Sequence, residues 1–250
     1  FLPSIGRLTR YRPPAEIAAG PLLDNGKWQD DAPAGETAVR NDTGVYEGGE
    51  ISMYYDPMIA KLCTWAPTRE GAIERMRVAL DSFEVEGIGH NLPFLSAVMD
   101  HPKFVSGEMT TAFIEEEYPD GFEGVELAEG ELKRIAAATA AMHRLGEIRR
   151  ARVSGRMDNH ERKVGSDWNV AVQGHSFDVT ISADKAGASV SFEDGATLRV
   201  AGDWTPGDHL ATMTVADKPL ILKVGKISGG FRIRTRGADL KVHVRTPLQA

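Results

Sequence analysis

The sequence predicts an α+β protein of two domains: an antiparallel sheet with helices, followed by an eight-stranded antiparallel β-barrel around an Ala-rich helix. Three observations support this fold class. Residues 69–83 place apolar side chains three and four positions apart, which is typical of an amphipathic helix. Residues 131–150 include five alanines, all between positions 136 and 141. Residues 168–245 alternate apolar and polar side chains in short runs, as half-buried strands do.

Residues 1–66 contain short extended runs separated by Pro, Gly and Asp/Asn clusters. The string Asp24-Asn25-Gly26 is a strong turn signal because these residue types accept a positive φ. This part of the chain is therefore expected to consist of strands and loops.

Helices are expected to follow. Thr68 can cap the first helix, because its hydroxyl can accept a hydrogen bond from a free N–H of the first turn. A second helix should begin near Asn91, and a shorter third one should lie around Thr110–Glu117. Pro102 and Pro119 are expected to separate these segments.

A change in charge composition marks a domain boundary. From Glu108 to Glu131 there are nine acidic residues and no basic one, interrupted by the string YPDGF at residues 118–122. We therefore divide the chain into a first domain, residues 1–118, and a second domain, residues 119–250.

The second domain is expected to contain a helix at 131–150 and a barrel at 168–245. Alanines give this helix a thin profile, so a sheet can approach it from several directions. Eight evenly spaced runs with turn residues between them favour a barrel that encloses the helix, and Asp194-Gly195 is expected to form a two-residue hairpin turn. A half-exposed surface helix is the alternative. The large apolar residues of the helix are Leu132, Ile135, Met142, Leu145 and Ile148.

Composition excludes several classes of protein. The 250 residues are 42% hydrophobic, without an apolar run of membrane-spanning length or a secretory signal, so we expect a soluble protein that does not enter a membrane. A net charge of −7 disfavours nucleic-acid binding, which depends on neutralising phosphates. The single cysteine, Cys63, rules out an internal disulfide and favours a reducing compartment, the cytoplasm or an organelle matrix.

No self-contained active site is recognisable from the residues. Cys63 lies in an apolar run and is expected to be a buried structural cysteine rather than a nucleophile. The seven histidines form no metal-binding spacing, so no metal site is expected from this chain alone. Phosphate-binding loops and nucleophile elbows are missing from the sequence, and Glu115–Glu117 are expected to be solvated.

Particular strings of the first domain carry a resemblance to a known family. The strings FLPSIG at 1–6 and MYYDPMIAKL at 53–62 resemble the C-terminal subdomain of biotin carboxylases. The string EGIGHN at 86–91 follows the first helix in the order that this family shows. The resemblance covers residues 1–118.

The remainder resembles the α subunit of propionyl-CoA carboxylase, a biotin-dependent acyl-CoA carboxylase. Its homologues continue after a string like that at 118–122 with a helix and an eight-stranded barrel, the BT domain, which docks the carboxyltransferase subunit. The best local agreement is the string SGRM at 154–157. The stretch Arg12–Asn41, longer than the corresponding turn of single-domain bacterial biotin carboxylases, also points to an acyl-CoA carboxylase.

The resemblance implies a reaction in two halves. ATP and bicarbonate carboxylate biotin with the help of Mg²⁺, and a partner subunit then transfers the carboxyl group to propionyl-CoA, giving methylmalonyl-CoA. The family's catalytic residues and its biotinylated lysine have no counterpart in this sequence, which also lacks an initiating Met, so we expect a fragment that is inactive alone. Only Ile88 maps onto the family's nucleotide site, as an apolar neighbour of adenine, and a plain core isoleucine is the alternative. Neither a catalytic residue nor a metal ligand is assigned.

Two partners are implied: the carboxyltransferase β subunit, and the biotin carboxyl carrier domain of the same subunit. Residues 149–167, the docking segment, join the helix to the first barrel strand, are longer than ordinary connections and are rich in arginine. Arginine and methionine are enriched in interface cores, and the resemblance implies that the docking domain reaches its partner through a loop in this position. This segment is therefore expected to bind the β subunit. A solvated linker is the alternative. The expected contact residues are Arg149, Arg150, Arg152, Arg156 and Met157.

Two other functions compete with this one. The first is a freestanding protein whose barrel holds an acyl-CoA or a lipid, which would require a lumen that the helix leaves open. The second is a thioesterase-like enzyme, which would require a carboxylate or a nucleophile facing a pocket, and the sequence offers no such residue.

Overall fold

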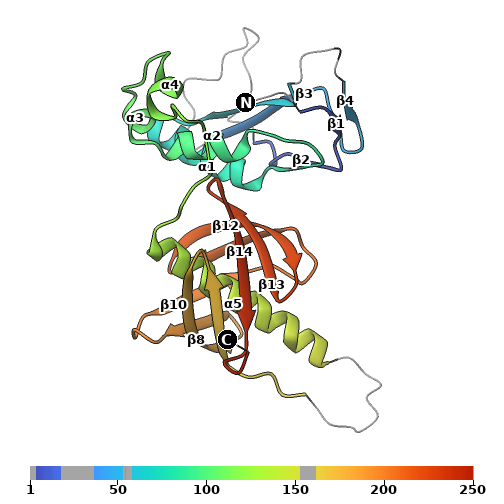
Figure 1. The fold of residues 1–250 in the computed structure, drawn as a ribbon, viewed down its shortest axis with the longest axis vertical. Coiled ribbons are helices and arrows are strands. Elements are labelled where there is room, and N and C mark those ends of the chain that lie inside the picture. The colour runs from blue at the N-terminus through green and yellow to red at the C-terminus, as the bar shows by residue number, and fades with distance from the viewer. Residues whose placement is uncertain (1–3, 18–36, 53, 55–57, 153–161, 250) are drawn as a thin grey trace. The chain divides into compact units, whose positions relative to one another are not determined.

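The chain forms two compact units, Phe1–Val125 and Glu126–Ala250, in a computed structural model (Figure 1). The structure describes residues 4–17, 37–52, 54, 58–152 and 162–249. The turn predicted at Asp24-Asn25-Gly26 and most of the long stretch Arg12–Asn41 lie outside the described residues.

In the part of the first unit that the structure describes, the strands pair in three two-stranded antiparallel sheets. In the first sheet Gly6 lies opposite Ile51, in the second Tyr11 lies opposite Val85, and in the third Arg40 lies opposite Cys63. The strand-and-loop character predicted for residues 1–66 is confirmed where the structure describes them. The pairs are β1 (Gly6–Arg7) with β4 (Glu50–Ile51), β2 (Arg10–Arg12) with β6 (Glu84–Glu86), and β3 (Ala38–Thr43) with β5 (Ala60–Trp65).

Helix α1 (Arg69–Ser82) begins as the sequence predicts. The side-chain hydroxyl of Thr68 accepts a hydrogen bond from the N–H of Gly71 at 3.1 Å, which satisfies one of the unpaired donors of the first turn. Helix α2 (Leu92–Asp100) follows Asn91, again as predicted.

Pro102 lies between α2 and α4, as predicted, but it also opens a short helix that the sequence did not predict. This helix is α3 (Pro102–Ser106), and it precedes α4 (Phe113–Glu117). Proline fits the first helical position because its missing N–H would have no partner there. His101 caps α3, since its side chain accepts a hydrogen bond from the N–H of Lys103.

Two apolar clusters hold the first unit together. The larger one joins the strands to α1 and α2 through Leu8, Tyr11, Ile51, Leu80, Phe83, Val85 and Leu92. The smaller one packs Tyr118 and Phe122 edge-on against Phe94, with ring centroids 5.2 and 5.6 Å apart. The string at 118–122 is therefore fixed to α2 by its two aromatic residues.

The second unit contains a closed antiparallel barrel of eight strands, as predicted. Their order around the barrel is β10-β11-β12-β13-β14-β7-β8-β9, so that β14 pairs with β7 and leaves no free edge. In several strands, residues two positions apart are buried, for example Val170 and Val172 of β7 and Leu240 and Val242 of β14. The strands are β7 (Asp167–Val172), β8 (His175–Asp184), β9 (Gly187–Phe192), β10 (Thr197–Gly202), β11 (Leu210–Val215), β12 (Lys218–Ile227), β13 (Gly230–Thr235) and β14 (Ala238–Arg245).

Helix α5 (Glu129–Ala151) fills the lumen of this barrel (Figure 1). It contacts β7, β8, β9, β10, β11 and β14, and eight of its eleven residues from Leu132 to Met142 are buried. The one polar side chain in that stretch of the core, Thr139, donates to the carbonyl of Ile135 at 2.8 Å. The prediction of a core helix is confirmed, although Leu145 is 44% exposed.

Arg134 fixes α5 to the end of the barrel. Its guanidinium donates to the carbonyls of Lys218 and Pro219, at 3.1 and 2.9 Å, and pairs with Glu131 at 2.8 Å. These contacts hold the helix against the hairpin between β11 and β12, whose two turn residues, Ala216 and Asp217, have φ of 52° and 60°.

The turn predicted at Asp194-Gly195 is longer than expected. Phe192 pairs with Ala196 through backbone hydrogen bonding, so Glu193, Asp194 and Gly195 form a three-residue loop. Gly195, at φ 85°, supplies the left-handed residue that such a loop needs after its turn. The pair Asp194-Gly195 therefore predicted the position of the turn correctly, but the turn has three residues and not two.

Candidate functional site

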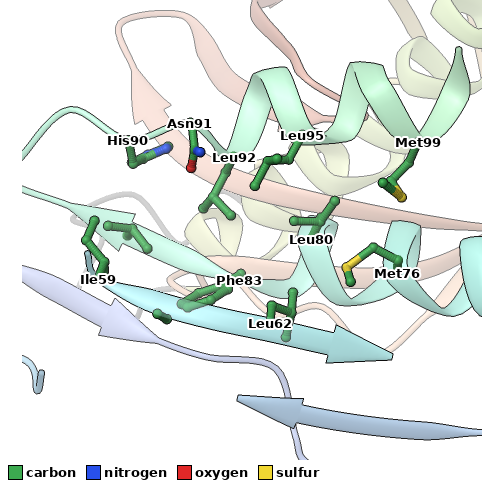
Figure 2. Close-up of a pocket in the computed structure, with 12 residues that line it drawn as sticks. Ile59, Leu62, Met76, Leu80, Phe83, His90, Asn91, Leu92, Leu95 and Met99 are labelled. Atoms are coloured by element: carbon green, nitrogen blue, oxygen red, sulfur yellow. The ribbon is translucent and has the colours of Figure 1, made fainter. Parts of the chain in front are cut away.

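A small apolar pocket lies in the first unit, between β5, α1 and α2 (Figure 2). Its volume is about 170 Å³, and its walls include Leu62, Leu80 and Leu95. Among its lining residues only His90 can titrate, and none is a carboxylate or a thiol. The pocket is thus mainly part of the packed core, and His90 has no carboxylate or thiol beside it in the lining.

Ile88 lies outside that pocket, at the edge of the same core. It is half-buried, and its Cγ2 atom would be 3.5 Å from a Cβ built on Gly6. Gly87 places it there: at φ 102° it approaches the backbone of Arg7 and Thr9 so closely that a Cβ would lie 2.2 Å from the carbonyl oxygen of Arg7. A contact of Ile88 with adenine stays a prediction.

The prediction that Cys63 is buried was wrong. Its side chain is exposed on β5, next to Arg40 of β3. The run around it looked uniformly apolar, but alternation along the strand turns Leu62 toward the core and Cys63 away from it.

The described residues contain neither a candidate metal site nor a helix that could span a membrane. No cluster of three or more His, Cys, Asp or Glu side chains there could hold a metal ion. Of the helices in the same part of the chain, none is long and apolar enough to cross a membrane.

The C-terminal end of α5 carries the first part of the predicted docking site. Arg149, Arg150 and Arg152 are all exposed there, where cations also interact favourably with the helix dipole. Arg149 donates to the carbonyl of Pro206, in the loop between β10 and β11, at 3.4 Å. Arg156 and Met157 lie outside the described residues.

A buried carboxylate lies beneath these arginines. Glu147, on α5, is only 6% exposed, and its two oxygens accept from two guanidinium groups. Oε1 is 2.8 Å from Nη2 of Arg150, and Oε2 is 2.6 Å from Nη2 of Arg162. Charge-assisted contacts of this length offset the cost of removing the carboxylate from water.

His143 lies one turn earlier on the same side of α5. Its Nε2 atom is 3.9 Å from Glu147, and its ring packs edge-on against Trp168 with centroids 4.9 Å apart. Burial lowers the pKa of His143 below its usual value; Glu147 opposes that shift and Arg150 adds to it. The imidazole is therefore neutral at pH 7.

A groove of about 540 Å³ opens beside this end of the helix. Its floor includes Leu145 and Ile148 of α5, and its opposite wall is the hairpin between β8 and β9 together with the end of β10. The exposed Leu145 gives this end of the barrel an apolar patch next to the arginines.

Sequence reasoning missed Glu147 and counted Arg162 only as one more positive charge of the docking segment. The structure pairs the two residues, which are 15 positions apart. The available signal was an isolated acid three residues before Arg150 on an otherwise Ala-rich helix.

Comparison with family models agrees with the two units. The model "Biotin carboxylase C-terminal domain" matches residues 1–116, and the model "Propionyl-coenzyme A carboxylase BT domain" matches residues 135–250. These two domains in succession define the class of the chain, a biotin-dependent carboxylase subunit.

Individual relatives specify the family further. The chain is 79% identical to a propionyl-CoA carboxylase alpha chain of Ruegeria pomeroyi, over all of this chain and 37% of the relative. It is 32% identical to the mitochondrial alpha chain of Mus musculus, over all of this chain and 32% of that one. The chain belongs to the family of propionyl-CoA carboxylase alpha chains, and it spans about a third of the length of these relatives.

A solved structure is also similar in sequence to part of the chain. It is the biotin carboxylase domain of the 2-oxoglutarate carboxylase of Hydrogenobacter thermophilus, in complex with MgADP, ADP and bicarbonate. The identity is 34% and the TM-score 0.39, over 50% of this chain and 23% of that chain.

Proposed function

We propose that residues 126–250 dock the carboxyltransferase β subunit of a propionyl-CoA carboxylase, and that the whole α subunit catalyses the ATP- and bicarbonate-dependent carboxylation of biotin. The docking proposal is supported by two features of this unit: the lumen of its barrel is filled, and the C-terminal end of α5 carries exposed arginines. Because α5 fills the lumen, the barrel can bind other molecules only through its outer surface and its ends.

The same observation disfavours the competing function. A freestanding acyl-CoA or lipid carrier needs an enclosed apolar cavity, commonly of 300 Å³ or more. In this barrel Ile135, Thr139 and Met142 occupy that position, each at most 1% exposed. The groove of about 540 Å³ at its end is open to solvent and is not the enclosed cavity that such a carrier needs.

Biotin, ATP and Mg²⁺ are assigned mainly to other parts of the whole subunit. Among the described residues, Ile88 would supply an apolar contact to adenine, and the remaining nucleotide contacts would come from elsewhere. A nucleotide with Mg²⁺ activates bicarbonate for transfer to biotin in this family. This chain would then supply the C-terminal part of the carboxylase domain and bind the partners of the whole subunit.

The partners are the β subunit and the biotin carboxyl carrier domain of the same subunit. The 79% identical relative is bacterial, which favours the cytoplasm over the mitochondrial matrix as the location.

Charge reversal in the docking segment tests the proposal. A full α subunit carrying Arg152→Glu, Arg156→Glu and Met157→Ala should bind the β subunit more weakly by about 2 kcal/mol or more if these are hot-spot residues. Titration of the two subunits measures this change. The matched control reverses two exposed lysines of the barrel wall, Lys226→Glu and Lys241→Glu, and should leave the affinity nearly unchanged. Undiminished affinity of the triple variant would eliminate the proposal.

A further inference from the structure

The groove beside the C-terminal end of α5 contains an arginine that lacks a hydrogen-bond acceptor. Arg144 lies on α5 and lines the groove, where it is half-buried. Its Nε atom is buried and has no hydrogen-bond partner in the described part of the chain. Such a donor is costly, because burial removes its hydrogen bonds to water without replacing them. Arg144 is therefore a group that a bound partner can satisfy.

The other charges of the groove leave this guanidinium uncompensated. Asp184, in the hairpin between β8 and β9, pairs with Arg199 of β10 at 2.6 Å. The hydrogen bond from Arg199 lowers the pKa of Asp184 to about 2. Lys185 and Asp203 are both exposed and of opposite sign, so together they add no net charge. The net positive charge of the groove thus lies on Arg144.

Apolar and small side chains form most of the remaining surface of the groove. Leu145 and Ile148 lie close to Arg144 on the same helix, and Leu145 is exposed although it is apolar. The opposite wall consists of residues too small to fill the space in front of them. These are Ala183, Ala186, Gly187, Ala188, Ala201 and Gly202. Exposed apolar surface around an arginine is typical of the core of a protein–protein interface.

Contacts within the barrel fix the walls of the groove. Trp204, one of its lining residues, donates from Nε1 to the carbonyl of Asp208 at 3.0 Å. Gly187 approaches β10 so closely that a Cβ would lie 2.3 Å from the carbonyl oxygen of Val200. A partner therefore does not have to overcome the entropic cost of ordering this surface when it binds.

We propose that this groove binds an acidic side chain of the β subunit together with the apolar residues that flank it. The carboxylate pairs with Arg144, and the flanking side chains cover Leu145 and Ile148. Charge complementarity favours this partner, because Arg149 and Arg150 add positive charge at the same end of α5. The inference rests on the proposed docking function and extends the interface to residues of the barrel, beyond the docking segment.

Titration of the full α subunit with its β subunit tests the charge. Arg144→Met removes the guanidinium but keeps an apolar stem, so it should weaken association about tenfold, as the loss of a hydrogen bond between charged groups does. Arg144→Lys keeps the charge and should stay within about threefold of the wild type. The matched control is Lys133→Met, which removes a charge on α5 where Lys133 pairs with Asp194, and it should bind normally.

A second pair of variants tests the shape of the groove without changing a charge. Ala183→Phe fills the groove from the exposed end of β8 and should weaken association about tenfold or more, because it excludes the flanking apolar residues. The matched control is Ser182→Phe. Ser182 is also exposed, but it lies on the opposite face of the same strand and does not line the groove. This control should bind like the wild type.

Several outcomes would overturn the inference. Full affinity of Arg144→Met and Ala183→Phe, with weakened binding of the docking-segment triple variant, would refute the groove and leave the docking proposal intact. Full affinity of the triple variant would instead refute the docking proposal itself. Self-association of the free α subunit that Ala183→Phe abolishes would assign the groove to a second copy of the chain. If Arg144→Met unfolds the barrel, Ala183→Phe decides the question, because it changes an exposed residue.

Discussion

At the scale of single residues, the pKa of His143 links the stability of the second unit to pH. Its ring is half-buried between Trp168 and Phe231, and burial lowers its pKa below the usual 6.5. The unfolded chain therefore takes up a proton at a higher pH than the folded chain does. The resulting contribution to stability is complete above pH 6.5 and is lost as the pH falls through the lowered pKa of the folded state.

Replacement of this histidine should make stability less dependent on pH. We expect His143→Gln to lose less unfolding free energy than the wild type between pH 7 and pH 5, because the substitute cannot be protonated. Denaturant unfolding at a series of pH values measures this difference. The matched control is His175→Gln on the exposed start of β8, which should keep the wild-type slope. Identical slopes for all three proteins would contradict the expectation.

Single residues were also where prediction from sequence was weakest. The burial of Cys63 depends on which face of β5 turns toward α1, and an apolar run does not reveal that choice. The pairing of Glu147 with Arg162 depends on how residues far apart in the chain return to the same place. Local sequence patterns contain neither kind of information.

At the scale of elements, periodicity predicted almost everything that the structure shows. Alternation with period two identified the eight barrel strands, and the alanine content of α5 predicted that a helix could be enclosed. These signals are reliable because burial imposes them on every turn of a helix or every second residue of a strand. The short helix α3 was missed because five residues are too few to show a period.

The enclosed helix gives a direct prediction for stability. Ile135→Asp places a charge where the residue is fully buried, so the second unit should lose about 3–5 kcal/mol and unfold. The control is the same change on the same helix at Leu145, which is 44% exposed and should cost far less. Thermal unfolding followed by circular dichroism compares the two variants. Similar melting of Ile135→Asp and the wild type would contradict the enclosed position of α5.

At the scale of the whole molecule, the chain consists of two units with separate cores. The first unit offers the predicted neighbour of a nucleotide, and the second offers the proposed docking site. The composition shift between Glu108 and Glu131 led us to expect a boundary between residues 118 and 119, and the two compact units of the structure divide between Val125 and Glu126.

This division predicts where affinity for the β subunit resides. A chain of residues 126–250 alone should bind the β subunit within about threefold of the affinity of residues 1–250, since the proposed contacts all lie in the second unit. Calorimetric titration of the two chains provides the comparison. A loss of more than about tenfold would assign part of the interface to the first unit.

The closed barrel also limits the order in which the second unit can be made. Helix α5 precedes all eight strands in the sequence, so it leaves the ribosome first and is present when each hairpin forms. The ring closes when β14 pairs with β7 and brings Val242 opposite Val172, which requires the last strand of the chain. Until then, β7 and the most recently added strand both expose unpaired edges on which other chains can pair. A polypeptide truncated before β14 should therefore aggregate. In the complete polypeptide, the pairing of β14 with β7 removes both unpaired edges at once.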